Sequence, residues 1–264
     1  MGRVEEVIPS QERHWSRHAA RYDEVFIDPF APGVVNPLWD ALGAVEDRGA
    51  KTVIDLGCGT GPLLPMLLDR YGFGRVIALD FAPAMLARAR ERLGPDGAAR
   101  VEFLERPMAD LGDLRGRVDV AVALNSLVMP DVRVIDATLR AVREALRPGG
   151  VLLGVVPSLD SIQYQTMLQF DQALEIGMGP AEARRFTATH AEHRLYDFAF
   201  GLFRYRGLRQ KFWTPFEVEH RLARAGFRAG PPSKVLYPWD EGVPAMAELS
   251  HFPPSWDWFF EARP

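Results

Sequence analysis

The chain has little cysteine, no excess of positive charge and no long apolar run. Cys58 is the single cysteine among 264 residues, which excludes an internal disulfide framework and a multi-cysteine metal site. The net charge of −4 disfavours a uniformly basic nucleic-acid-binding protein. No segment predicts a membrane span, and no signal peptide is visible at the start of the sequence. We therefore expect a globular protein of the reducing cytoplasm.

A glycine-rich segment follows the first strongly apolar run. In residues 53–61 this run contains one acid, Asp55, and then Gly57, Gly59 and Gly61 alternate with small residues. The pattern is typical of a buried parallel strand that turns sharply into a helix and leaves backbone accessible at its carboxyl end. Glycine tolerates positive φ and lets a ligand approach the main chain closely. The segment therefore predicts a small-molecule site.

Apolar runs alternate with helical patterns along much of the chain. From residue 52 to residue 156 this alternation predicts parallel strands joined by helices, which would cover both faces of the sheet. The sequence indicates strands at residues 52–56, 75–79, 101–104, 118–124, 151–156, 234–237 and 256–262. The predicted fold class is therefore α/β, with a doubly wound, mostly parallel, seven-stranded sheet.

The spacing of the glycines indicates which ligand fits. A nucleoside-triphosphate loop would end in Gly-Lys-Ser/Thr, whereas Pro62 and Leu63 follow Gly61 here. A dinucleotide loop would read Gly-x-Gly-x-x-Gly, and Pro62 removes an N–H donor that a phosphate would use. An NAD-dependent oxidoreductase is therefore disfavoured. Asp80 ends the second strand about 20 residues beyond the loop, where an acid binds ribose hydroxyls. These features favour a ligand with ribose and adenine but no pyrophosphate.

Several ordered motifs resemble the class I S-adenosylmethionine-dependent methyltransferases. They lie at residues 18–23, 53–61, 76–86, 118–127 and 146–152, and the resemblance resumes at residues 214–227 and 256–263. The resemblance implies a methyltransferase that uses S-adenosyl-L-methionine and releases S-adenosyl-L-homocysteine. The expected sheet is Rossmann-like, with an antiparallel last strand.

The resemblance also implies which residues contact the cofactor. They are Tyr22, Asp55, Gly57, Cys58, Gly59, Asp80, Phe81, Met85, Met108 and Asn125. Asp80 would bind the ribose hydroxyls, Asp55 would lie near the methionine amino group, and Tyr22 would close over the carboxylate. Pro107 stands where the family has an acid that reaches the adenine amino group, so the residue that replaces this acid is left open.

The alternation stops after Pro157. Residues 158–213 exceed an ordinary crossover in length, and their aromatic and arginine-rich second half favours neither helix nor strand. We expect a helical N-terminal cap segment at 1–50, a cofactor-binding core at 51–157, a cap or acceptor-site insertion at 158–213, and completion of the sheet at 214–264.

Three histidines are candidate general bases for an acceptor that carries a proton. His190 and His193 lie in the insertion, and His18 lies in the element expected near the cofactor. Solvated surface histidines are the plainer interpretation, and we expect no metal site.

Residues 184–211 contain seven basic residues, two acids and interleaved aromatics. Such a segment stacks RNA bases, binds an anionic small molecule, or forms a cap whose arginines cover its outside. The leading hypothesis is a methyltransferase for a small acceptor, anionic or aromatic, in secondary metabolism. The alternatives are an RNA methyltransferase and a non-catalytic protein that binds S-adenosylmethionine. The atom that receives the methyl group and the oligomeric state are left open.

Overall fold

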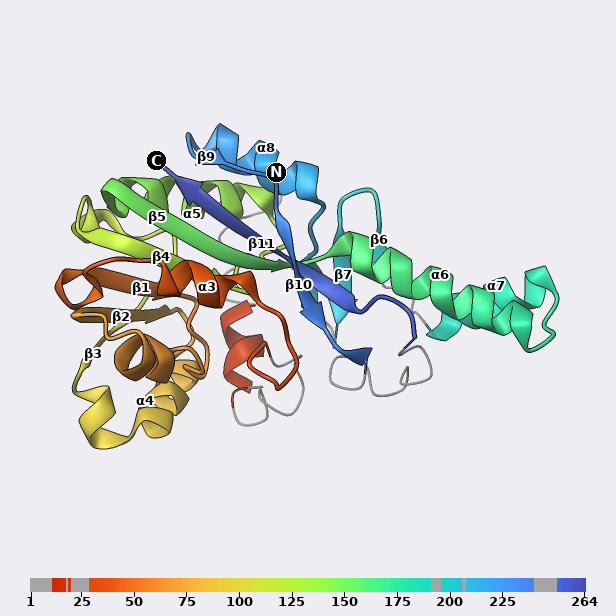
Figure 1. The fold of residues 1–264 in the computed structure, drawn as a ribbon, viewed down its shortest axis with the longest axis horizontal. Helices are drawn as coiled ribbons and strands as arrows, with labels where there is room; N and C mark the ends of the chain where they lie inside the picture. Colours follow the sequence, from red (N-terminus) through yellow and green to blue (C-terminus); the bar gives the residue numbers. More distant parts are fainter. Residues whose placement is uncertain (1–10, 18, 20–28, 191–195, 206–207, 240–250) are drawn as a thin grey trace.

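The computed structural model describes residues 11–17, 19, 29–190, 196–205, 208–239 and 251–264. Helices cover both faces of a central twisted sheet, and one pair of helices projects beyond it (Figure 1). Of the N-terminal segment, residues 11–17 are helical.

The main sheet contains eight strands, seven of which form one continuous path. The strands are β1 (Thr52–Leu56), β2 (Arg75–Asp80), β3 (Val101–Glu105), β4 (Val118–Leu124), β5 (Leu146–Pro157), β9 (Arg228–Ala229), β10 (Ser233–Tyr237) and β11 (Ser255–Arg263). Their order is β10-β11-β5-β4-β1-β2-β3, and β9 pairs with β11. Strands β1 to β5 are mutually parallel, whereas β11 runs antiparallel to both β5 and β10.

This sheet confirms the predicted fold class, including the antiparallel last strand. Six of the seven predicted strands agree with the structure to within one residue at either end. The seventh, β5, begins at Leu146 rather than at residue 151, because its first residues pair with Val118 of β4. The short β9 was not predicted.

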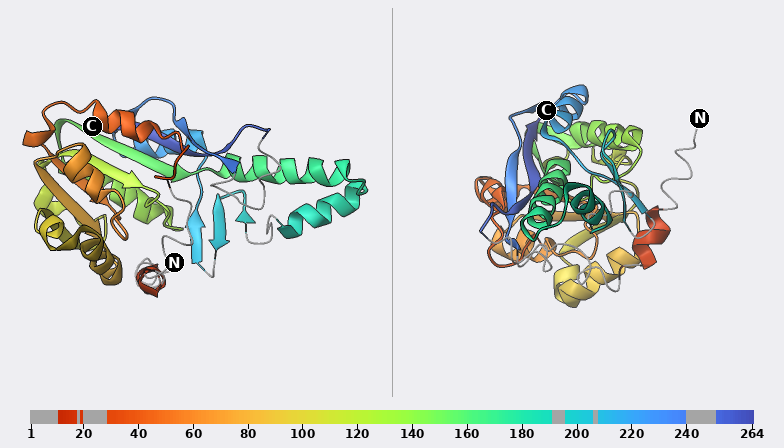
Figure 2. Two further views of the ribbon diagram at one scale, coloured as in Figure 1. Left: turned by 60° about the horizontal axis from the view of Figure 1, so that its bottom comes forward. Right: turned by 90° about the vertical axis from the view of Figure 1, so that its right-hand side faces the viewer.

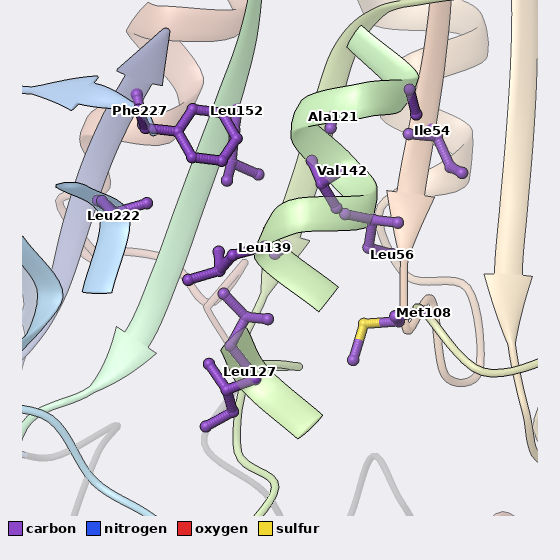
Figure 3. Close-up of a cluster of buried hydrophobic side chains, with 14 of the residues drawn as sticks. Ile54, Leu56, Met108, Ala121, Leu127, Leu139, Val142, Leu152, Leu222 and Phe227 are labelled. Atoms are coloured by element: carbon purple, nitrogen blue, oxygen red, sulfur yellow. The ribbon is translucent and has the colours of Figure 1, made fainter. Parts of the chain in front are cut away.

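The helices fall into two layers. They are α3 (Pro37–Gly43), α4 (Pro83–Ala98), α5 (Val132–Ala145), α8 (Pro215–Arg224) and the short turns η2 (Arg48–Ala50), η3 (Met66–Arg70) and η4 (Gly112–Leu114). One apolar cluster joins α5 and α8 to one sheet face, and a second joins α3, η3 and α4 to the other. Figure 3 shows the first cluster, in which Leu139 and Val142 of α5 lie near Leu56 of β1.

Side chains of β5 alternate between these two clusters. Val151 and Leu153 belong to the cluster with α3, whereas Leu152 belongs to the cluster with α5. Burial of each such side chain stabilises the fold by roughly 1.5–3 kcal/mol. Gly154 breaks the apolar run because a Cβ there would lie 2.2 Å from the ring of Phe260. The glycine therefore makes room for an aromatic side chain of β11.

Three helix boundaries differ from a simple interpretation of the sequence. The turn after the glycine segment does not become helical at Pro62, because residues 62 and 63 form a turn and a π-helical turn, η3, follows. Helix α3 is short, and the side chain of Asn36 caps its start by accepting a hydrogen bond from the N–H of Leu38. Helix α4 changes direction at Gly94, which has φ 65° and ψ 175°.

The insertion has two different parts. Helices α6 (Leu159–Glu175) and α7 (Pro180–His190) form a hairpin that extends away from the sheet (Figures 1 and 2). Strands β6 (Tyr196–Asp197), β7 (Leu202–Tyr205) and β8 (Leu208–Lys211) form a separate antiparallel sheet. The arginine- and aromatic-rich segment is therefore mostly strand. In the described ranges, no helix is long and apolar enough to cross a membrane.

A buried lysine fixes the small sheet to the main domain. Lys211 is 1% exposed, and its Nζ donates to the carbonyl of Phe200 at 3.0 Å and to Glu217 of α8 at 2.5 Å. Glu217 also pairs with Arg221, which pairs with Asp136 of α5. This buried network holds the end of β8 at one position relative to the sheet.

Candidate functional site

A cavity of about 600 Å³ opens at the carboxyl ends of β1, β4 and β5. Ligands bind at this edge in open α/β sheets. Because β11 is antiparallel to β5, its first residues lie at the same edge, and Asp257 pairs with Pro157. The cavity is lined by Trp15, Pro29, Phe30, Asp55, Gly57, Cys58, Gly59, Pro62, Leu63, Met66, Arg92, Leu124, Asn125, Val128, Pro157, Ser158, Ser161, Ile162, Gln165, Gln210, Phe212, Tyr237, Ser255, Trp256 and Asp257.

The glycine segment forms one wall, which we call the glycine wall (Asp55 to Leu63). Gly57 and Gly59 have φ of 67° and 55°, a conformation that residues with a side chain rarely adopt. A Cβ at Gly57 would lie 2.7 Å from the Cβ of Ser126. The backbone of this wall is therefore exposed to the cavity for a steric reason, and a side chain at Gly57 would force it to move.

Asp80 holds the glycine wall from behind. Its two carboxylate oxygens accept hydrogen bonds from the N–H groups of Gly59, at 2.9 Å, and Ala82, at 2.8 Å. Burial raises the pKa of Asp80 to about 6, and these hydrogen bonds partly oppose that rise. The carboxylate is not in the cavity lining, so in this structure it fixes the loop.

Asp55 is the acid of the glycine wall. It is 2% exposed and lies in β1 one residue before that strand ends. Burial raises the pKa of Asp55 to about 7, and the nearby charge of Asp80 adds to the rise. A positively charged ligand group beside this carboxyl would favour its ionised form.

A second acid, Asp257, lies in the opposite wall. One oxygen accepts hydrogen bonds from the Tyr237 hydroxyl at 3.0 Å and from Asn125 Nδ2 at 3.4 Å. The other oxygen accepts the N–H of Ser158 at 3.2 Å. Burial raises the pKa of Asp257 to about 6, and all three donors oppose that rise. We call Asn125, Tyr237 and residues 255–257 the acid wall.

Asn125 joins the two walls. It follows β4 directly, has φ 52° and donates its N–H to the carbonyl of Val155 at 2.9 Å. A non-glycine residue in the left-handed region is uncommon and is often found where a site constrains the backbone. The same residue therefore adopts a strained backbone conformation and donates a side-chain hydrogen bond to Asp257.

Several polar atoms of the cavity have no hydrogen-bond partner among the described residues. They are Asn125 Oδ1, Gln210 Nε2, Ser255 Oγ and Trp256 Nε1. Two of them are donors, one is an acceptor, and the Ser255 hydroxyl can be either. Buried polar groups are otherwise nearly always paired, so this group of atoms marks a place for a polar ligand.

The structure brings together part of the predicted site. Asp55, Gly57, Cys58, Gly59 and Asn125 all line the cavity. The remaining described candidates, Asp80, Phe81, Met85 and Met108, do not line it. Met85 packs with Ala19 and Ala82, and Met108 belongs to the core cluster that contains α5.

The histidine candidates are not placed in the site. His18, His193 and Tyr22 lie outside the described residues, and His190 is the last residue of α7. Sequence reasoning missed Asp257, Tyr237 and Ser255. The only available signal was one acid, Asp257, inside an otherwise aromatic strand. Within the described residues, no group of His, Cys, Asp and Glu could hold a metal ion.

Comparison with known proteins matches this site to one family. The model of the methyltransferase domain family matches residues 53–150. Trans-aconitate 2-methyltransferase of Deinococcus radiodurans is 35% identical over 123 residues, which are 46% of this chain and 44% of that protein. Malonyl-[acyl-carrier protein] O-methyltransferase of Acetivibrio thermocellus is 28% identical over 53% of this chain and 47% of that protein. The chain thus spans about half the length of these relatives.

Solved structures show that the fold likeness extends along nearly the whole chain. A Burkholderia thailandensis 1,6-didemethyltoxoflavin-N1-methyltransferase, with its bound substrate and S-adenosylhomocysteine, has a TM-score of 0.65 and 20% identity. The match covers 100% of this chain and 91% of that one. The DhpI–S-adenosylhomocysteine complex has a TM-score of 0.58 and 20% identity, and it covers 99% and 98% of the two chains. At this identity the likeness concerns the fold.

Proposed function

Because the chain belongs to the class I S-adenosylmethionine-dependent methyltransferases, which its residues 53–150 match, we propose that it methylates a small molecule bound in the cavity. The observation that carries this proposal is the joint position of Asp55 and the positive-φ glycines at one end of the cavity. When bound, S-adenosylmethionine supplies a methyl group on a positively charged sulfonium.

The residues of the glycine wall fit this cofactor. Gly57 exposes backbone that a Cβ would cover, so the methionine part could lie against the main chain. Asp55 is buried and has a raised pKa, so an ammonium group beside it would stabilise its charged form. Pro62 lacks an N–H and lines the same end, which disfavours a phosphate there.

The individual cofactor contacts are part of the proposal. The backbone of Gly57, Cys58 and Gly59 would hold the methionine moiety. The remaining residues proposed to contact the cofactor are Tyr22, Asp55, Asp80, Phe81, Met85, Met108 and Asn125. Asp80 would need to share its carboxylate between the loop N–H groups and the ribose, and a carboxylate has about four acceptor positions for this purpose.

The rest of the cavity suits exclusion of water and alignment of the acceptor. Aromatic and aliphatic side chains line it between the two walls, including Phe30, Val128 and Ile162. Methyl transfer disperses charge, so a dry and oriented site accelerates it without many side-chain contacts. His18, His190 and His193 remain predicted base candidates.

A small acceptor is favoured over RNA. The relatives are named for methylation of trans-aconitate and of a malonyl group on a carrier protein, and a fold neighbour for methylation of 1,6-didemethyltoxoflavin. Arg204 and Arg209 pair on β7 and β8 and are absent from the cavity lining. Roles in the cytoplasm and in secondary metabolism, and the four-part division of the chain, remain predictions.

Calorimetry tests the proposal. S-adenosylhomocysteine should bind the protein in the micromolar range, and the Asp55→Asn variant should bind it at least about tenfold more weakly, a loss of 1.4 kcal/mol. NAD and ATP should not bind. Preferred binding of NAD would refute the proposal, and cofactor binding without turnover of any acceptor would favour the non-catalytic alternative.

A further inference from the structure

The acid wall contains a carboxylate that the cofactor does not require. Asp257 lines the cavity from β11, whereas the glycine wall comes from β1 and the turn after it. Its partners come from separate parts of the chain: Tyr237 from β10, Asn125 from the end of β4, and the N–H of Ser158 from the start of α6. This convergence fixes the carboxylate at the far end of the cavity.

Resting on the proposed function, we propose that Asp257 removes the proton of a neutral acceptor, so the cavity selects planar N–H or O–H molecules over carboxylates. The acceptor's N–H or O–H bond breaks, and its proton moves to a carboxylate oxygen of Asp257. The electron pair of that bond forms the new bond to the methyl carbon. The carbon–sulfur bond breaks, and its electron pair stays on sulfur, which becomes neutral.

The hydrogen bonds of Asp257 leave room for this proton. A carboxylate has about four acceptor positions, and three donors occupy three of them. The oxygen bonded to the N–H of Ser158 has that single partner. At neutral pH, Asp257 is mostly ionised even with its pKa raised to about 6, so it can accept a proton.

Unpaired polar atoms around Asp257 indicate the shape of the acceptor. Ser255 is 3% exposed, lies two residues from Asp257, and its Oγ has no partner in the described parts of the chain. Trp256 Nε1, Gln210 Nε2 and Asn125 Oδ1 are unpaired in the same cavity. A molecule with both donors and acceptors would pair them, as ring N–H and carbonyl groups do.

The charges that face the cavity disfavour a carboxylate acceptor. Asp55 and Asp257 are acids of the lining, and Arg92 is the one cation among the described lining residues. Arg92 donates to the carbonyl of Thr60, so it belongs to the glycine wall. An anionic acceptor would therefore lie against Asp257 with no cation from the acid wall. A carboxylate acceptor is also already ionised and would not require a base.

Equilibrium binding tests the selection without turnover. The protein is saturated with S-adenosylhomocysteine and titrated with matched pairs that begin with 2-quinolone and quinoline-2-carboxylate. We expect the neutral member to bind at least about tenfold more tightly. In Asp257→Asn the preference should fall to about threefold or less, since the like charge is removed. Asp160→Asn is the matched control, because Asp160 bonds Trp258 Nε1 and does not line the cavity.

Each outcome decides the inference. A carboxylate that binds as tightly as its neutral partner, or a preference unchanged in Asp257→Asn, overturns it. Failure of every neutral member to bind at millimolar concentration overturns it as well. Failure of S-adenosylhomocysteine to bind the wild-type protein instead refutes the proposed function, so the two failures are distinct.

The pH profile of methyl transfer tests the proton step. With a neutral acceptor, transfer should rise with pH through an apparent pKa near 6, and Asp257→Asn should lower it by about 10²–10⁴-fold. Tyr237→Phe removes a donor to Asp257, so the rise should move to higher pH while the cofactor affinity is kept. A profile that Tyr237→Phe leaves in place would contradict the role of Asp257 as the base.

Discussion

The two walls of the cavity are built in different ways. The glycine wall is mostly backbone, its conformation is set by Gly57 and Gly59, and Asp80 pairs its polar groups from behind. The acid wall consists of side chains, and several of its polar atoms are unpaired. A paired backbone wall is suited to one constant ligand, whereas an unpaired side-chain wall is suited to a second ligand that varies between proteins of one fold.

The buried acid of the glycine wall should give the largest effect. The folded pKa of Asp55 is about 7, above its unfolded value of 3.8, so folding retains a proton between these two pH values. Raising the pH through this window therefore lowers the free energy of unfolding of the ligand-free protein, by on the order of 4 kcal/mol from Asp55. Denaturant unfolding between pH 4.5 and 7.5 measures it.

Two variants check the source of this pH dependence. Asp55→Asn should flatten the profile, whereas Asp69→Asn should not, since Asp69 is an exposed partner of Arg100. Binding of S-adenosylhomocysteine to the wild-type protein should release protons near pH 6.5, because its ammonium favours ionised Asp55. Proton uptake instead would place the ammonium elsewhere.

Removal of Asp80 tests the pairing behind the glycine wall. Asp80→Ala leaves the N–H groups of Gly59 and Ala82 unpaired, so we expect a destabilisation of roughly 3 kcal/mol. Asp80→Asn should be intermediate, because an amide has one acceptor oxygen. Both should weaken binding of S-adenosylhomocysteine. Equal stability of Asp80→Ala and the wild-type protein would show that the loop needs no such support.

A matched pair of glycines separates close approach from backbone strain. Gly57 and Gly72 have φ of 67° and 68°, but a Cβ would clash with Ser126 only at Gly57 and would meet open space at Gly72. We expect Gly57→Ala to lower cofactor affinity about 100-fold, or 2.7 kcal/mol, and Gly72→Ala to leave it unchanged. Calorimetry with S-adenosylhomocysteine distinguishes them, and equal losses would contradict the steric explanation.

Deletion of an unpaired group in the acid wall should hardly affect folding. Ser255→Ala removes a buried hydroxyl without a partner among the described residues, so stability should change by less than about 0.5 kcal/mol or increase. Affinity for a neutral acceptor should fall in the same variant. A large destabilisation would mean that Ser255 is paired within the fold and that the two walls are alike.

The smallest effect is expected outside both walls. Arg204→Gln with Arg209→Gln should leave cofactor affinity and methyl transfer to a small acceptor unchanged, because neither residue lines the cavity. The double variant should also leave the weak RNA binding unchanged in gel-shift titrations. Salt-sensitive RNA binding that this change abolishes would instead support the RNA methyltransferase alternative.

The difference between the walls explains how much the sequence predicted. The glycine wall is encoded locally, because glycine spacing and Pro62 act through the backbone of neighbouring residues. The acid wall depends on pairing between distant segments: Asn125 and Asp257 are 132 residues apart, and Ser158 and Asp257 are 99 apart. No local pattern specifies that the antiparallel register places Asp257 opposite Pro157.

The same reason applies to the fold. The central strands were predicted well because they are apolar over their whole length, as buried parallel strands are. The small sheet of β6, β7 and β8 was not predicted, since its aromatic and basic residues fit either a helix or a strand. Its position is fixed by tertiary contacts such as those of the buried Lys211.

The burial of Cys58 gives this protein an intrinsic chemical timer. The thiol lies inside the glycine segment, is 5% exposed, and has its pKa raised well above the ordinary value by burial. An alkylating reagent reacts with thiolate, so it should modify only molecules whose glycine segment has opened. Because the chain has one cysteine, the rate of mass gain reports that opening directly, with no mutation, dye or background signal from another thiol.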